Sequence, residues 1–264
     1  MLSPERFAEL CKISCMGNQL HASAIRWLSH VPFPTTLVWL PETVGADEEA
    51  LLLAAPFLGE SPDGLSLCRD PLGKPYPARR GYPVPWLHIS NTHDGGQRLL
   101  LAAKHENLVG VGLDVVHLPR LRSPHKDRAY LHRLAARFME PTEYERFQCA
   151  ARQDDEEALR RRVAAHFSLM EAASKALGTG LKVGAFMGHS ASLPLSALGA
   201  LQLEPSVQLF FDDHAQTRLA TLNAQRWEAY WGSDDTYLVS AVFLFDNEQI
   251  NKLPLDEQTP FMSY

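Results

Sequence analysis

The feature that most constrains the fold is the segment LVGVGLDVV, Leu108–Val116, in which only Asp114 is charged. An apolar run of this length predicts a strand that is covered on both faces, so other elements must pack on each side of it. Burying the carboxylate of Asp114 without compensation would be costly. We therefore expect it to meet a cation, a set of hydrogen-bond donors or a metal ion. The alternative is that Asp114 caps a neighbouring loop.

The first half of the sequence predicts strands and one helix, separated by proline and glycine. A stretch dense in proline, Leu67–Trp86, cannot form regular structure for long, because proline has no backbone donor. The expected elements are a strand at Thr35–Leu40, a helix at Glu48–Phe57, and strands at Trp86–Ser90 and Gln97–Lys104 joined by a polar turn at Asn91–Gly96.

The second half predicts helices first and strands afterwards. Thr142 and Glu145 form a capping box at the start of one helix, and Gly178 is a left-handed stop at the end of another. The acidic opening of the longest helix suits the positive end of its dipole. The expected elements are helices at Lys126–Arg137, from Thr142, and at Asp154–Leu177, a glycine-rich stretch at Gly178–Ser192, and strands near Gln208–Phe211, Trp227–Trp231 and Tyr237–Phe245.

The order of elements predicts an α+β protein with an internal pseudo-duplication, because each half ends in a strong apolar strand. The repeat is one of element order and not of letters. We divide the 264 residues into an N-terminal half at 1–112, a C-terminal half at 113–246 and a polar tail at 247–264.

Charge and hydropathy exclude several kinds of partner. A formal net charge of -6 is unfavourable for binding nucleic acid, which requires a basic face. The longest apolar stretches, Leu51–Leu58 and Leu238–Phe245, are too short for a membrane span. Glu5 and Glu9 interrupt the region where a signal peptide would need an apolar core. We therefore expect a cytoplasmic protein that binds neither nucleic acid nor a membrane.

The cysteines do not form a metal-binding pattern. None of the four makes a Cys-x2-Cys pair, and we expect all of them to be reduced, structural thiols: Cys11, Cys15, Cys68 and Cys149.

The longest predicted helix carries a second unusual feature. Its apolar residues recur at helical spacing and define one buried stripe: Leu159, Val163, Phe167, Met170 and Leu177. Glu171 and Lys175 lie one turn apart on the flank of this stripe, where they can be held at the rim of the core and still reach a ligand. The plainer interpretation is a solvated i,i+4 ion pair, worth about 0.2–0.5 kcal/mol.

Taken together, Asp114, Glu171 and Lys175 suit a pyrophosphate ligand. Magnesium is commonly held by one or two carboxylates, with water and phosphate oxygens completing its octahedron, and a lysine can contact the phosphate. One carboxylate can also accept a proton from an attacking hydroxyl.

Five segments in order resemble the motifs of 4'-phosphopantetheinyl transferases. GVGLDVV at Gly110–Val116 resembles their Gly-Ile-Asp-Ile-Glu strand, and FSLMEAASKALGTGL at Phe167–Leu181 resembles their catalytic helix. RFMEPTEYERF, GKPY and LHIS, which begin at Arg137, Gly73 and Leu87, are similar to three further segments. The two-half layout is similar to that of the larger, surfactin-type class, which implies a pseudo-duplicated two-lobe fold with a small sheet and a long helix in each lobe.

The resemblance implies a monomeric enzyme that transfers 4'-phosphopantetheine from coenzyme A to a serine of an apo carrier protein, with Mg²⁺ as cofactor. Its metal ligands would be Asp114 and Glu171, with Glu171 also the base, and Lys175 would contact phosphate. The coenzyme A site would include Arg69 for the 3'-phosphate, Lys74 and Pro75 at the nucleotide end, and Ser90.

Three positions depart from the family pattern. Val116 replaces a second strand carboxylate, which water can replace in a magnesium shell. Met170 replaces a lysine, which implies the loss of a phosphate contact. Asn91 stands where the family has a phosphate-binding histidine. Either His93, which shares a face with Asn91 if the strand continues, takes over that role, or it is a histidine of a surface turn.

Two other functions remain open. The protein could bind coenzyme A or a carrier protein without transferring anything. GHSAS at Gly188–Ser192 is close to the Gly-x-Ser-x-Gly elbow of serine hydrolases, and Asp212 or Asp213 with His214 would keep the order of a catalytic triad. However, Ser192 would crowd the strained turn of such an elbow, and no strong apolar strand leads into it.

Overall fold

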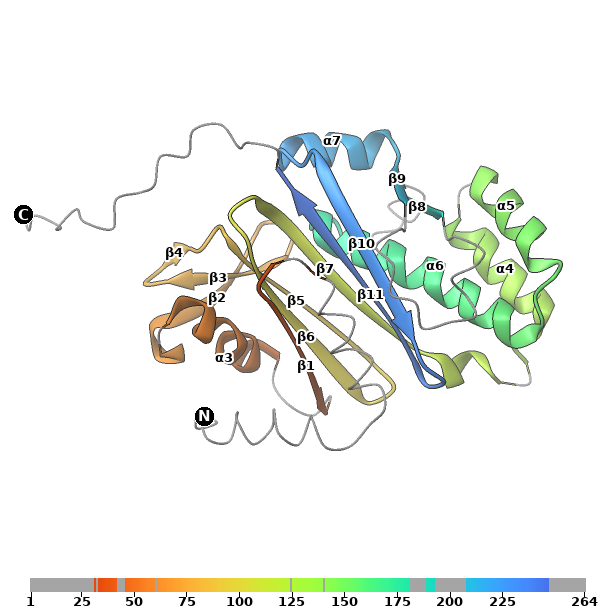
Figure 1. Cartoon of the computed structure of the whole chain (residues 1–264), viewed down its shortest axis with the longest axis horizontal. Coiled ribbons are helices and arrows are strands. Elements are labelled where there is room, and N and C mark those ends of the chain that lie inside the picture. The colour runs from red at the N-terminus through yellow and green to blue at the C-terminus, as the bar shows by residue number, and fades with distance from the viewer. Residues whose placement is uncertain are drawn as a thin grey trace, which may run out of the picture.

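The computed structural model describes residues 31, 33–41, 46–59, 61–123, 125–139, 141–180, 189–192 and 208–246. They form an α+β fold, as predicted (Figure 1). Its strands are β1 (Thr35–Pro41), β2 (Leu65–Arg69), β3 (Pro75–Arg79), β4 (Tyr82–Pro83), β5 (Leu87–Asp94), β6 (Gln97–Lys104), β7 (Leu108–His117), β8 (His189–Ser192), β9 (Gln208–Phe211), β10 (Arg226–Ser233) and β11 (Tyr237–Phe245). Its helices are α3 (Ala46–Leu58), α4 (Arg128–Phe138), α5 (Pro141–Ala151), α6 (Glu156–Leu177) and α7 (Asp213–Thr221), with short 3-10 helices η1 (Pro62–Gly64) and η2 (Leu118–Leu121).

The N-terminal sheet is antiparallel, in the order β1-β6-β5, and α3 packs on one face of it. The polar turn predicted at Asn91–Gly96 is wrong in extent, because β5 continues through Asp94. Only Gly95 and Gly96 form the turn, with φ of 59° and 78°. Two consecutive residues with positive φ make a tight hairpin turn whose twist matches that of the strands, so the residues before it stay paired with β6.

The C-terminal sheet is also antiparallel, in the order β10-β11-β7, and α6 packs on one face of it. The strand predicted at Leu108–Val116 is confirmed as β7, and eight of its ten residues are buried. Alternate residues of β7 face opposite ways. Val116 packs toward α6, whereas Leu113 and Val115 pack toward the N-terminal sheet.

The two sheets face each other across a shared apolar core, and each has its helix on the outer side (Figure 1). Side chains from β6, β7 and β11 meet in this core, including Leu101, Leu113 and Phe243, which are fully buried. The arrangement agrees with the predicted two-lobe fold, in which a small sheet packs with a helix in each lobe, although α3, with 13 residues, is much shorter than α6, with 22. The predicted division at residue 112 falls inside β7 and remains a prediction.

A third small sheet, β2-β3-β4, lies beside the N-terminal sheet. It occupies the proline-rich stretch, and its strands are five, five and two residues long. Their shortness agrees with the expectation that prolines limit regular structure here.

The predicted helices are confirmed, with corrections at their starts. Helix α5 begins at Pro141, so Thr142 lies inside the helix and the predicted Thr142–Glu145 capping box is wrong. Proline is favoured at the first helical position, because the missing N–H has no partner there anyway. Helix α6 is capped by Asp155, whose side chain accepts a hydrogen bond from Ala158 N, and it ends at Gly178 with φ of 73°, as predicted.

Of the cysteines, Cys68 and Cys149 are free thiols, whereas Cys11 and Cys15 lie outside the described residues. No helix in the described ranges is long and apolar enough to cross a membrane.

Candidate active site

Two glycines of β7 set the position of α6 in the C-terminal lobe. A Cβ atom on Gly112 would lie 1.8 Å from Ala172 O, and one on Gly110 would lie 2.4 Å from Ala176 O. The backbone of the helix therefore rests directly on the strand, which no side chain would permit. Asp114 is two residues beyond Gly112 on the same face of β7, so the close approach brings it against the middle of α6.

Asp114 is almost fully buried at this contact, with 3% of its surface exposed. Its Oδ1 accepts hydrogen bonds from Lys175 Nζ at 3.0 Å and from Thr92 Oγ1 at 3.1 Å. Burial raises the pKa of Asp114 to about 6, an effect that Lys175 opposes and Glu171 increases. The expectation that this carboxylate meets a cation and donors is confirmed. It does not cap a loop.

The inner oxygen of Asp114 lies in a buried polar region. In the part of the chain that the structure describes, Asp114 Oδ2 and the hydroxyls of Ser168 and Ser240 have no hydrogen-bond partner of normal geometry. Ser240 lies opposite Asp114 in the register of β11 and β7. Ser168, on α6, is still close enough to lower the pKa of Asp114.

Lys175 joins the two carboxylates. Besides Asp114, its ammonium contacts Glu171 Oε1 at 3.3 Å and donates to Leu113 O at 3.0 Å. Glu171 and Lys175 are both about one quarter exposed, which agrees with the predicted position at the rim of the core. The pair is therefore not the solvated surface pair of the plainer interpretation, because Lys175 also reaches a buried acid.

The acid pair fits a magnesium ion that is completed by a ligand. Among the described residues, no group of three or more His, Cys, Asp and Glu side chains could hold a metal ion. Magnesium does not require such a cage, since it commonly takes one or two carboxylates together with water and substrate phosphates. An acid whose second oxygen has no partner, beside a second acid one quarter exposed, matches that demand.

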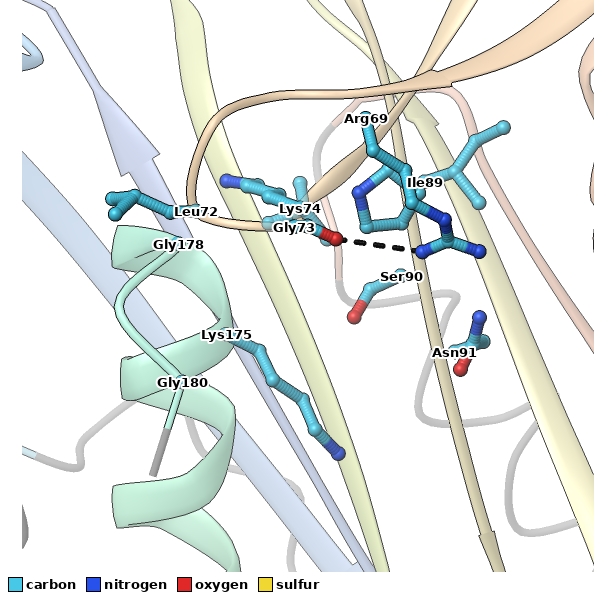
Figure 2. A pocket seen from close by; sticks show the side chains of 12 residues that line it. Arg69, Leu72, Gly73, Lys74, Ile89, Ser90, Asn91, Lys175, Gly178 and Gly180 are labelled. Carbon is cyan, nitrogen blue, oxygen red and sulfur yellow. Dashed lines mark hydrogen bonds between the residues drawn. The ribbon is translucent and has the colours of Figure 1, made fainter. Parts of the chain in front are cut away.

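Two adjoining cavities open on this cluster. The first has a volume of about 210 Å³ and extends from Arg69 and Lys74 to Asn91 and Lys175 (Figure 2). The second has a volume of about 320 Å³, and Asp114, Glu171 and His93 are among its lining residues. Asn91 and Lys175 line both, so the two cavities meet beside the acid–lysine cluster.

Asn91 and His93 both reach this cleft. They lie two residues apart on β5 and line the second cavity. Because β5 continues through Asp94, His93 is a strand residue and not part of a surface turn. The position of His93 beside Asn91 is thus compatible with the first of the two predicted alternatives.

The residues predicted for the nucleotide end line the first cavity, but two of them are engaged by the protein itself. Arg69 pairs with Asp47 at 3.0 Å and donates to Gly73 O at 3.4 Å (Figure 2). Lys74 donates to Ala176 O at 2.6 Å in the last turn of α6. Burial lowers the pKa of Lys74 to about 8. Pro75 also lines this cavity.

Ser90 is buried between the lobes. It lines the first cavity, and its hydroxyl accepts a hydrogen bond from Leu113 N at 2.9 Å. The hydroxyl proton stays available to a ligand, but the oxygen also holds β7 against β5.

Val116 and Met170, two of the residues that depart from the family pattern, are core residues. Val116 packs between β7 and α6, with 1% of its surface exposed. Met170 packs with Phe138 and Phe147 of α4 and α5 and lines neither cavity. The side chain of Met170 therefore points into the core of this protein.

The hydrolase alternative does not fit the structure. Ser190 lies in β8, in a regular antiparallel pair with β9, and not in a turn between a strand and a helix. Asp212 is the N-cap of α7, where its side chain accepts a hydrogen bond from Ala215 N at 2.8 Å. Gly188 lies outside the described residues. Within the glycine-rich stretch at Gly178–Ser192, residues 189–192 form β8.

Sequence reasoning missed three residues of the site. Thr92 bonds to Asp114, Ser168 faces it from α6, and Arg120 lines the second cavity while pairing with Asp94 at 3.1 Å. Ser168 lies inside the segment Phe167–Leu181 that resembles the family's catalytic helix, and Thr92 is one residue after Asn91, whereas Arg120 lies in none of the five segments.

A strand carboxylate, a helix carboxylate and a lysine in one cleft define a site suited to a divalent cation and phosphate oxygens. Residues 110–235 match the model of the 4'-phosphopantetheinyl transferase superfamily, and this range contains three of the five ordered segments. Residues 110–235 therefore carry a domain of this superfamily. No curated protein matches the chain.

Several solved structures are similar to about half of the chain. The holo-[acyl-carrier-protein] synthase of Neisseria meningitidis is matched over 98% of its length and 52% of this chain, with 22% identity and a TM-score of 0.40. The Helicobacter pylori synthase in complex with coenzyme A is matched over 98% and 51%, with 20% identity and a TM-score of 0.35. The Bacillus anthracis synthase in complex with CoA (3',5'-ADP) is matched over 98% and 53%, with 19% identity and a TM-score of 0.37.

Proposed function

We propose that the protein is a Mg²⁺-dependent 4'-phosphopantetheinyl transferase that moves 4'-phosphopantetheine from coenzyme A to a serine of an apo carrier protein. The observation that carries this proposal is the meeting of Asp114, Glu171 and Lys175 where two cavities join. One cavity can hold a nucleotide and the other a second substrate, with the acid–lysine cluster between them. We place the reaction in the cytoplasm and expect a monomer.

The reaction needs one base and one stabilising cation from the protein. The carrier serine Oγ bonds to the β-phosphorus of coenzyme A, and the bond from that phosphorus to the bridging oxygen breaks. The serine proton passes to the carboxylate of Glu171, directly or through a water. The leaving group is 3',5'-adenosine bisphosphate, and Lys175 neutralises the charge that develops on the phosphate oxygens.

Asp114 and Glu171 would hold the magnesium ion, which when bound neutralises the pyrophosphate. Lys175 is well placed for its role, because its ammonium already lies between both carboxylates. Lys175 also opposes the burial that raises the pKa of Asp114 to about 6, and so favours the ionised form that can accept a cation.

The first cavity supports a site for the nucleotide end. Arg69 is half exposed and can turn from Asp47 toward a 3'-phosphate. Lys74 and Pro75 line the same cavity, and Ser90 and Asn91 continue it toward Lys175. His93 brings an imidazole ring to the second cavity, where the family histidine is absent.

The test is transfer to a panel of apo carrier proteins. The protein is incubated with coenzyme A and Mg²⁺, and mass spectrometry follows the pantetheine adduct on the carrier serine. We expect an adduct on at least one fatty acid, polyketide or nonribosomal peptide carrier. Glu171→Gln should reduce its rate of formation by about 10²-fold or more, as expected on removing a general base.

Glu156→Gln is the matched control. Glu156 is an exposed acid of the same helix, paired with Arg160 and about 22 Å from Glu171 along the axis. It should leave the rate unchanged. Coenzyme A binding without an adduct on any carrier would favour a protein that binds but does not transfer. Full activity of Glu171→Gln would refute the assigned base.

A further inference from the structure

Four alternate residues of β5 face β7, and three of them take the place of a strand partner. Among the strands that the structure describes, β7 lies at the edge of its sheet and pairs with β11 alone. Its other edge is met by side chains of β5: His88 Nε2 donates to Leu108 O at 2.7 Å, Ser90 Oγ accepts from Leu113 N at 2.9 Å, and Asp94 Oδ2 accepts from His117 N at 2.8 Å. The spacing of two follows from the strand period, which turns these side chains to one face.

Thr92 belongs to the same row but has a different partner. Its hydroxyl donates to a side chain, the Oδ1 atom of Asp114, at 3.1 Å, whereas the other three bond to the backbone of β7. Thr92 and Asp114 are both buried, at 5% and 3% exposure, so water does not compete for this bond. It connects the N-terminal lobe directly to an acid of the site.

A donor at this oxygen controls the orientation of the carboxylate. A carboxylate can rotate about its Cβ–Cγ bond, and the second bond to Oδ1, from Lys175, comes from a long side chain one quarter exposed. The β-branched Thr92 is the stiffer of the two donors. Hydrogen-bond partners of metal ligands typically account for about 10–100-fold in metal affinity.

We propose that Thr92 is a positioning residue for Asp114. Its hydroxyl holds Oδ1 and so fixes the orientation in which the carboxylate takes the divalent cation. The role of Thr92 in catalysis rests on the proposed function, but the experiment measures cation binding alone. A structural role is the rival, in which Thr92 merely fills the interface between the lobes. Thr92→Val keeps the shape and removes the hydroxyl, whereas Thr92→Ser keeps the hydroxyl and removes the methyl group.

The experiment titrates Mn²⁺, a spectroscopically visible substitute for Mg²⁺, into the full-length protein with and without coenzyme A. The EPR signal of free Mn²⁺ gives the affinity. We expect Thr92→Val to bind Mn²⁺ about tenfold more weakly, and Thr92→Ser to stay within about twofold of the wild type. His88→Leu is the control, because it removes another member of the row without touching Asp114, and its Mn²⁺ affinity should be unchanged.

Melting of the metal-free variants establishes that each is folded. Wild-type Mn²⁺ affinity in folded Thr92→Val would overturn the proposal, and so would an equal loss in Thr92→Val and Thr92→Ser. An equal loss in His88→Leu would also overturn it, since lobe contact in general would then be responsible. If the wild type modifies no carrier but Thr92→Val alone loses Mn²⁺ affinity, the proposed function fails and the role of Thr92 stands.

Discussion

The sheets β1-β6-β5 and β10-β11-β7 share one plan, but they contribute different chemistry to the cleft between them. From β5 the N-terminal sheet supplies the neutral side chains of Ser90, Asn91 and Thr92, and further along the strand His93 and Asp94, an acid that pairs with Arg120. The C-terminal lobe supplies the charged cluster of Asp114, Glu171 and Lys175. Buried charge is tolerated in that lobe because its partners come from the same strand–helix contact.

The helices α3 and α6 also pack differently on their sheets. In the N-terminal lobe, alanines of α3 lie against larger strand residues such as Ile89 and Leu100. In the C-terminal lobe the small residues are glycines of the strand, so that the helix backbone itself touches β7. The lobe with the acid pair is therefore the one in which helix and strand are pressed together.

Gly112→Ala should give the largest effect. The new Cβ would lie 1.8 Å from Ala172 O and 2.5 Å from Ala176 N, and neither backbone atom can move like a side-chain tip. We expect a loss of about 3 kcal/mol in the free energy of unfolding, measured by urea denaturation. Gly96→Ala, in the hairpin of the other lobe, has a φ of 78° but open space around it, and should cost about 1 kcal/mol. Equal losses would refute the difference in packing.

A second prediction concerns how the stability of the fold depends on pH through His88 of β5, which bonds to β7. Burial lowers the pKa of His88 from 6.5 to about 4. Between these values the unfolded chain binds a proton that the folded protein does not, so this residue makes stability fall as pH decreases from 6.5 to 4. The total is about 3 kcal/mol, at 1.36 kcal/mol per pKa unit.

His88→Gln removes the titrating group and keeps a side-chain donor for Leu108 O. We expect the wild type to lose more stability than the variant on acidification, with the difference developing between pH 6.5 and 4 in chemical denaturation. Parallel pH profiles would show that His88 is not kept neutral by the fold.

The smallest expected effect concerns Asn91, an uncharged residue of β5 that lines both cavities. Asn91→His restores the family histidine on β5 and should lower the KM for coenzyme A by about fivefold, since a charge-assisted hydrogen bond to phosphate is stronger than a neutral one. If His93 already serves this role, His93→Gln should raise the KM by a similar factor. Unchanged KM in both variants would place the phosphate away from β5.

Much of the fold was predictable because its signals are local. The continuous apolar run at Leu108–Val116 predicted β7. Helical spacing, an acidic start and the stop at Gly178 predicted α6. The core stripe also placed Met170 correctly as a core residue, although the family motif suggested a phosphate contact. The burial pattern was the better guide there, because it reports the direction of the side chain in this chain.

The errors arose where neighbouring elements decide the structure. Asn91–Asp94 are polar, but pairing with β6 extends β5 through them as far as the two-glycine turn. The Thr142–Glu145 spacing looks like a capping box, yet Pro141 starts the helix. In both cases a nearby residue with a stronger backbone preference overrode the local pattern.

The sequence by itself determined the C-terminal lobe of the site. Asp114 stands alone in an apolar strand, and Glu171 and Lys175 lie one turn apart on a helix flank. Only the tertiary structure decided how β5 joins them: that Thr92 reaches Asp114, that Ser90 bonds to Leu113, and that Asn91 lies where two cavities meet. The reason is physical. Spacing along one strand or helix sets the face that a residue occupies, whereas contacts between lobes depend on how two separate sheets pack.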